Sequence, residues 1–147
     1  MSFVKGCFDP QQQTFLYGHV GRERYASRGV AGGGIVCLSL SGEHNSEMAQ
    51  AAGRWILDQP FDRYNRGPGP YHYGAYYCSQ AMFQLGGDYW EKFYPHLDES
   101  LLRFQRPDGS WDVENHLNGD TFGHCYTTAL CVLAMTPPYQ LLPIYQR

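Results

Sequence analysis

Long hydrophobic runs are absent from this sequence: no stretch reaches the roughly 18 consecutive apolar residues that a membrane-spanning helix needs. The first residues, Met1 to Lys5, lack the charged and then apolar pattern of a secretory signal. Basic residues are also scarce, with 11 Lys and Arg against 14 Asp and Glu, and they form no run that could follow a phosphate backbone. These absences predict a soluble, cytoplasmic protein that neither spans a membrane nor binds nucleic acid.

Cysteine is too sparse for a disulfide framework. The five cysteines are an odd number, and three of them lie inside apolar segments with helical spacing, namely Cys37, Cys78 and Cys131. Buried free thiols are therefore the better interpretation. Aromatic residues are abundant, by contrast, at 16% of the chain with 12 Tyr, which is typical of either large packing residues or an aromatic-lined cavity.

Three segments align so that their apolar residues stay in register. They begin at Val30, Ala75 and Cys125, which gives offsets of 45 and 50 residues. The position of Ile35 is an exception, because Gln80 occupies it in the second segment. A period of this length indicates stacked helical hairpins.

Helical periodicity predicts an all-α fold in one domain that covers residues 1–147. The five expected helices span residues 30–40, 46–59, 73–85, 88–104 and 124–135. Pro95 should kink or split the fourth of them. Residues 1–28 are expected to form an irregular arm or an eroded repeat, and residues 137–147 a proline-rich, extended tail.

The most specific motif is a helix corner at Gln105–Trp111, with the sequence QRPDGSW. Pro107 stops the helix that contains Leu101, and Gly109 can take the positive φ of a turn. Trp111 can then fold back over the corner. We expect Gln105 to stack on the indole and to satisfy unpaired N–H groups at the start of the following helix.

The spacing of Leu101, Gln105, Gly109 and Trp111 resembles the QW motif of squalene and oxidosqualene cyclases and the related repeats of protein prenyltransferase β subunits. A degenerate copy at Trp55–Gln59 keeps the helix end and the Gln but lacks the Trp turn. The resemblance implies an α/α toroid, in which six helical hairpins form an outer ring around an inner one. With about two and a half hairpins, this chain is expected to be the C-terminal part of a larger toroid, an open arc, or a half-ring that pairs with itself.

The residues that carry catalysis in this superfamily are missing. No D-x-D-D acid motif occurs, and Thr127 stands where the prenyltransferases that the chain resembles place a zinc-binding His. We therefore expect no metal or other cofactor, and a hydrogen-bonded packing role for His124. The carboxylates around the corner are expected to be solvated turn and cap residues: Asp108, Asp112, Glu114 and Asp120.

A cluster of aromatic residues opens the predicted third helix and is the candidate binding surface. If the resemblance holds, helix starts of this kind surround the mouth of a central cavity, where aromatic rings hold isoprenoid chains. The alternative is that these rings only pack against neighbouring helices. The candidate residues are Tyr71, His72, Tyr73, Tyr76 and Tyr77, with Tyr126 as the counterpart in the next repeat.

Three consecutive glycines, Gly32–Gly34, are expected to allow two helices to approach closely rather than to bind phosphate.

Three function classes stay open. The leading hypothesis is a cyclase-like repeat domain without autonomous catalysis, which binds an isoprenoid or other hydrophobic ligand or forms half of a toroid. A protein-interaction scaffold is the second class. The third is a carbohydrate-active α/α barrel that uses Asp112 and Glu114.

Overall fold

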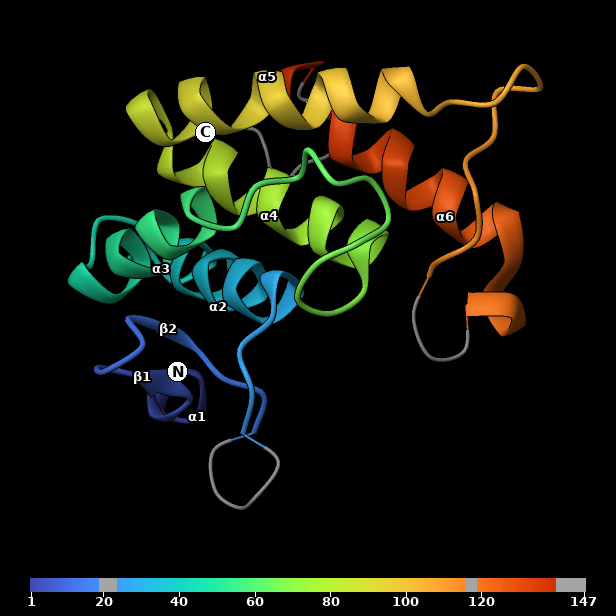
Figure 1. Ribbon diagram of the computed structural model, residues 1–147. Helices are drawn as coiled ribbons and strands as arrows, with labels where there is room; N and C mark the ends of the chain where they lie inside the picture. Colours follow the sequence, from blue (N-terminus) through green and yellow to red (C-terminus); the bar gives the residue numbers. More distant parts are fainter. Residues whose placement is uncertain (19–23, 116–118, 140–147) are drawn as a thin grey trace.

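The computed structural model describes residues 1–18, 24–115 and 119–139 (Figure 1). A two-stranded antiparallel hairpin near the N-terminus consists of β1 (Phe8–Asp9) and β2 (Thr14–Phe15). All other regular elements are helical: α1 (Ser2–Gly6), α2 (Arg28–Leu40), α3 (Glu47–Leu57), α4 (Tyr71–Leu85), α5 (Gly87–Arg103), α6 (Gly119–Met135) and the 3₁₀ helix η1 (Pro137–Tyr139). The predicted all-α class is confirmed.

The five predicted helices correspond to α2–α6, with boundaries that differ by a few residues. In α6, Gly123 has a non-helical backbone (φ 68°, ψ −177°), so the regular part of this helix begins after it, as predicted. Of the two effects expected of Pro95, a kink or a split, the split is wrong, because α5 continues through Pro95. Pro95 is exposed, so water can satisfy the backbone carbonyl that loses its N–H donor there.

The helices form two layers. In the first layer α4 packs between α2 and α6. The second layer consists of α3, which packs on α2 and α4, and α5, which packs on α4 and α3. Figure 1 shows α5 lying across α4, with α2 and α6 on either side of α4.

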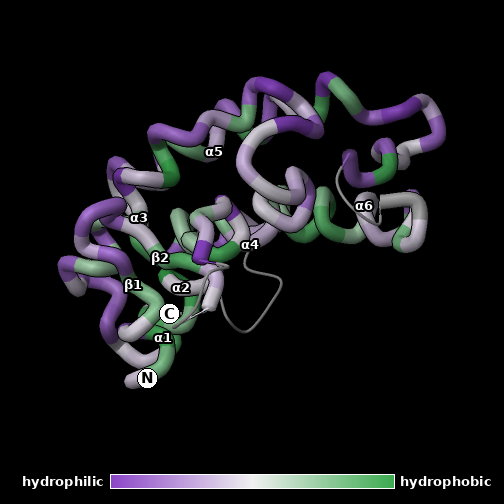
Figure 2. The backbone as a smooth tube through the Cα atoms, turned by 60° about the horizontal axis from the view of Figure 1, so that its bottom comes forward, coloured by the Kyte–Doolittle hydropathy of each residue, from purple (hydrophilic) through white to green (hydrophobic). Residues whose placement is uncertain are grey.

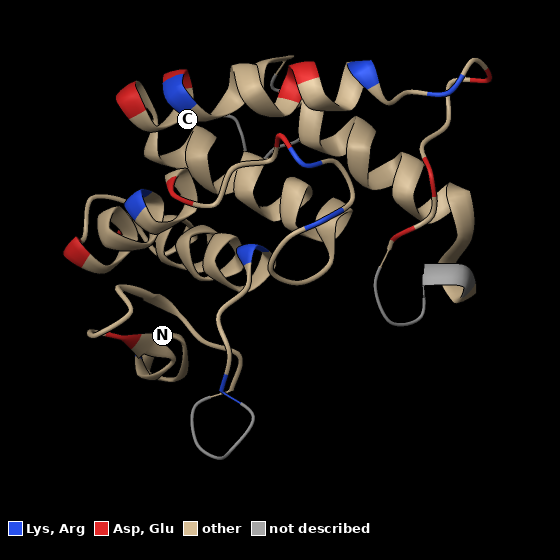
Figure 3. Cartoon of the chain, viewed as in Figure 1, with Lys and Arg blue, Asp and Glu red and all other residues tan. Residues whose placement is uncertain are grey.

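The distribution of charge follows from this layering. The central helix α4 has no Lys, Arg, Asp or Glu, whereas α5 carries charges along its exposed side (Figure 3). A helix that neighbours cover on several sides must be apolar nearly all round, while a helix at the surface needs only one apolar stripe. None of the helices in the described residues has the length and apolarity needed to span a bilayer.

Gly32 allows the closest contact between α2 and α4. A Cβ atom at Gly32 would lie 2.6 Å from the Tyr77 carbonyl carbon and 2.8 Å from the Cys78 nitrogen, both backbone atoms that cannot move aside. The predicted role of these glycines in close helix approach is therefore confirmed at Gly32. Gly34 faces the ring of Phe15 instead, which belongs to β2.

The N-terminal segment is more regular than predicted. Instead of an irregular arm, residues 1–18 form α1 and the β1–β2 hairpin, which we call the N-terminal arm. Thr14, Phe15 and Leu16 are buried, and Phe15 packs against α2 at Gly34. In Figure 2, hydrophobic segments of α1, β2 and α2 lie together at the N-terminal end of the molecule. The arm therefore covers the side of α2 that faces away from α4.

The predicted extended tail falls mostly outside the described residues. Its first three residues form η1, and Pro137 is buried.

The close approach at Gly32 can be tested by adding a single methyl group. We expect Gly32→Ala to lower the free energy of unfolding by about 1–3 kcal/mol or more, because the added Cβ meets fixed backbone. Gly33→Ala is the matched control, because its Cβ would meet only the Tyr77 ring, at 3.8 Å. The control should be neutral or up to about 1 kcal/mol more stable, because Ala favours the helix. Urea denaturation of both variants checks this, and equal effects would contradict the close approach.

Candidate functional site

The predicted Trp corner is present between α5 and α6. Trp111 is 2% exposed, and its indole Nε1 donates a 2.8 Å hydrogen bond to the Leu101 carbonyl oxygen. Gly109 has the positive φ (84°) that the turn requires, and the carboxylate of Asp108 accepts hydrogen bonds from the backbone N–H and the hydroxyl of Ser110. The indole therefore folds back over the end of α5, as expected.

Gln105 does not have its predicted role. Its side chain is exposed, and its Nε2 donates to the Gly109 carbonyl oxygen within the same turn. It therefore bridges the two sides of the turn, and it accepts from no N–H group at the start of a helix in the described residues.

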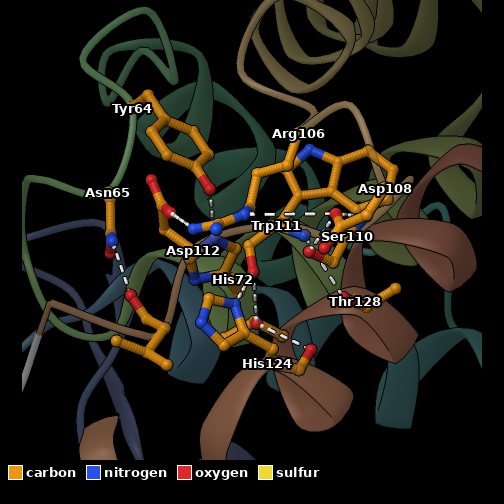
Figure 4. A network of polar contacts seen from close by, with 12 residues as sticks. Tyr64, Asn65, His72, Arg106, Asp108, Ser110, Trp111, Asp112, His124 and Thr128 are labelled. Atoms are coloured by element: carbon orange, nitrogen blue, oxygen red, sulfur yellow. Dashed lines mark hydrogen bonds and ion pairs between the residues drawn. The ribbon is translucent and has the colours of Figure 1, made fainter.

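The start of the regular part of α6 holds the backbone of Trp111 (Figure 4). The Trp111 N–H donates to the hydroxyl of Thr128, and the Trp111 carbonyl oxygen lies 2.6 Å from His124 Nδ1 and accepts from the buried Thr127 hydroxyl. His124 is thus a hydrogen-bonded structural residue, as predicted. No group of three His, Cys, Asp or Glu side chains in the described part of the chain could hold a metal ion.

Glu114 has a structural role that the sequence interpretation did not predict. It was expected to be a solvated cap, yet it is only 6% exposed. Its two carboxylate oxygens accept hydrogen bonds of 2.7 and 2.8 Å from the backbone N–H groups of Tyr71 and His72, and Oε2 lies 3.2 Å from His72 Nδ1. Glu114 therefore caps the N-terminus of α4 from 42 residues away in the sequence.

Asn65 holds the stretch of chain that contains Glu114. Its side chain donates to the Val113 carbonyl oxygen and accepts from the Asn115 N–H, each at 2.7 Å. Burial acts to raise the pKa of the Glu114 carboxyl, but the His72 ring and the two backbone N–H groups outweigh it, and the net pKa is lowered. The carboxylate is therefore held in its charged form.

Two of the candidate binding residues, Tyr71 and His72, lie inside the protein. The Tyr71 hydroxyl contacts the Phe61 carbonyl oxygen at 2.9 Å and Ser100 Oγ at 3.0 Å, and burial raises its pKa to about 12. His72 Nε2 lies 3.1 Å from the Tyr64 hydroxyl. Both side chains are buried, at 1% and 0% exposed, and do not line an open surface.

The remaining candidates lie on α4 and α6. The rings of Tyr73 and Tyr77 are 4.7 Å apart, and those of Tyr76 and Tyr77 are 4.9 Å apart. Burial, followed by the neighbouring hydroxyls of Tyr77 and Tyr126, raises the pKa of Tyr73 to about 12. Tyr73 is still 38% exposed. We call Tyr73, Tyr76, Tyr77 and Tyr126 the tyrosine cluster.

An apolar groove lies beside the tyrosine cluster, between the N-terminal arm and α2. Its volume is about 410 Å³, which is within the range of small-molecule sites. Gly33 connects the two features, because it lines the groove and a Cβ there would touch the Tyr77 ring. The lining is formed by Phe3, Val4, Cys7, Phe15, Leu16, Tyr17, Gly18, Val30, Gly33, Gly34 and Cys37.

Cys37 is an exception to the buried thiols predicted from the sequence, because it is exposed where it lines this groove. The groove was not predicted from the sequence, because it depends on how the arm docks on α2.

The two carboxylates proposed for a carbohydrate site do not face a common cleft. Asp112 is exposed and forms a 3.0 Å ion pair with Arg106. Glu114 is buried and engaged with the start of α4. This arrangement gives neither group a role as a general acid beside the other.

Comparisons with protein-family models, with curated proteins and with solved structures found no match.

The cap made by Glu114 predicts a pH-dependent loss of stability. The pKa of Glu114 is lower in the folded chain than in the unfolded chain, where about 4.3 is usual. The contribution of the ionised carboxylate to the free energy of unfolding is therefore complete at neutral pH, and it disappears as the pH falls through the pKa of the folded state. We expect Glu114→Gln to lower the free energy of unfolding by about 1–3 kcal/mol at pH 7. The difference in stability between the variant and the parent protein should become smaller toward pH 3.

Urea denaturation at a series of pH values measures this difference. Asp112→Asn is the control, because its exposed ion pair should contribute less than about 1 kcal/mol. A constant difference for Glu114→Gln at all pH values would contradict the charged cap.

Proposed function

We propose that this chain binds an uncharged, elongated apolar ligand, such as an isoprenoid chain, and does not catalyse its conversion by itself. The observation that carries the proposal is the groove of about 410 Å³ between the N-terminal arm and α2, with the tyrosine cluster at its border.

The chemistry of the lining supports an uncharged ligand. No described residue that lines the groove is charged. The nearby cation Lys5 on α1 forms a 2.8 Å ion pair with Glu43, so it is already engaged. Burying a charged head group against such a lining would be costly, whereas a hydrocarbon chain gains about 25 cal/mol for each Å² of apolar surface it buries.

The tyrosine cluster extends the apolar surface beyond the groove. Aromatic rings supply large contact areas and can stack on an unsaturated chain. Tyr17 lines the groove and stacks on Tyr25, with ring centroids 5.2 Å apart. A ligand that is longer than the groove would therefore contact tyrosine rings at the point where the ligand leaves the groove.

The non-catalytic part of the proposal rests on where the carboxylates lie. Asp108 and Glu114 are engaged in a turn and a helix cap, and Asp112 is paired with Arg106. None of the three lines the groove. We therefore propose a cyclase-like repeat domain that holds a ligand or contributes part of a larger binding surface.

Binding of N-phenyl-1-naphthylamine, an uncharged fluorophore that brightens in apolar sites, tests the proposal. We expect saturable binding that farnesol displaces. Cys37→Glu should weaken binding by roughly tenfold or more, because it places a charge at an exposed position of the lining. Leu102→Glu is the matched control, because Leu102 is 52% exposed on α5 and does not line the groove.

Two further competitors define the ligand class. Farnesyl diphosphate has the isoprenoid chain of farnesol, and palmitate has a straight hydrocarbon chain. Both carry a charged head group, and both should displace the fluorophore less well than farnesol. The proposal fails if the fluorophore does not bind, or if Cys37→Glu and Leu102→Glu bind it equally.

A further inference from the structure

The helix α6 has an apolar face that the described residues leave open. Cys125, Ala129 and Val132 are exposed and lie at i, i+4 and i+7, so they form one stripe along the regular part of the helix. Val132 is 48% exposed. The opposite side of α6 packs against α4 and carries the buried residues Thr127, Leu130, Cys131 and Ala134. We call the exposed stripe the α6 face.

The two ends of the first layer differ. At the α2 end the N-terminal arm covers the outer side, where Phe15 is 1% exposed and its ring contacts Gly34. At the α6 end the described residues leave the stripe exposed. A head-to-tail stack of copies would require the arm to leave α2, whereas two copies that meet through their α6 faces leave both arms in place. A closed two-fold pair is therefore favoured over an open chain of copies.

The charge pattern also favours a second copy of this chain as the occupant. From Thr121 to Met135 there is no Lys, Arg, Asp or Glu (Figure 3). An exposed helical face normally carries charged residues. In a two-fold pair, a charged residue on the symmetry axis lies opposite the same residue of the second copy, and the two like charges repel each other. A face free of charge avoids this repulsion in a chain whose net charge is −3.

The stripe is self-complementary in an antiparallel arrangement. Because Cys125 and Val132 lie almost symmetrically about Ala129, rotating one helix by 180° places Cys125 opposite Val132 of a second copy. The small side chain of Ala129 then lies at the crossing point, where it lets the helix axes approach to the usual distance of about 8–10 Å.

We propose that two copies of this chain pair through the α6 face in an antiparallel, two-fold arrangement centred on Ala129. No residue of the α6 face lines the ligand groove, which is formed by the N-terminal arm and α2. It would join two partial layers of helices edge to edge.

Light scattering after size-exclusion chromatography tests the pairing. At about 0.1 mM protein we expect twice the chain mass of 16.8 kDa, with dissociation on dilution. Ala129→Glu should give the mass of one chain, because it places two carboxylates at the crossing point. Leu102→Glu, on an exposed apolar residue of α5, should keep the doubled mass. A single-chain mass for the parent protein, or a doubled mass for Ala129→Glu, would overturn the proposal.

Disulfide trapping gives a test that does not depend on disrupting the fold. In a Cys37→Ser background, which removes the other exposed thiol of the described residues, Val132→Cys should form a covalent dimer on mild oxidation through Cys125 of the second copy. Adding Cys125→Ser should lower the yield of the covalent dimer at least tenfold. Equal yields with and without Cys125 would contradict the antiparallel pairing.

Discussion

The connection between α5 and α6 holds three helices together, and the rest of the architecture depends on it. Trp111 joins the end of α5, through Leu101, to the start of the regular part of α6, through Thr128 and His124. A few residues later Glu114 caps the start of α4. One irregular segment thus fixes α4 and α6 side by side and places α5 above them. Its hydrogen bonds at Trp111 and Glu114 offset part of the conformational entropy that is lost when this segment becomes ordered.

Close packing within the first layer has two consequences for the surface. The glycines that let α2 approach α4 also leave part of the α2 surface without side chains. The ring of Phe15 from the N-terminal arm packs on this surface at Gly34, and an apolar groove remains between the arm and α2. At the other end α6 packs on α4 by one side, and its uncharged stripe stays exposed. The proposed ligand site and the proposed pairing surface both arise from the helix layer, at opposite ends of it.

The sequence predicted the helices well because their periodicity is local. It also placed the turn at Gly109 and the folding back of Trp111, since Pro, Gly and Trp act within a few residues of each other. It could not reveal that Glu114 is a buried cap, because the partner N–H groups lie 42 residues or more away. The groove was missed for the same reason: it depends on the docking of the arm, for which Phe15 and Leu16 were the only signal. The resemblance to the QW-motif proteins stays a prediction.

The most direct test of this account is amide hydrogen exchange at Tyr71 and His72. N–H groups in the first turn of a helix normally exchange quickly, because they have no partner within the helix. If Glu114 accepts hydrogen bonds from both, their exchange should be as slow as that of buried amides in the middle of α4. Exchange at the rate of an exposed loop would show that the α5–α6 connection does not hold α4 and would contradict the central claim.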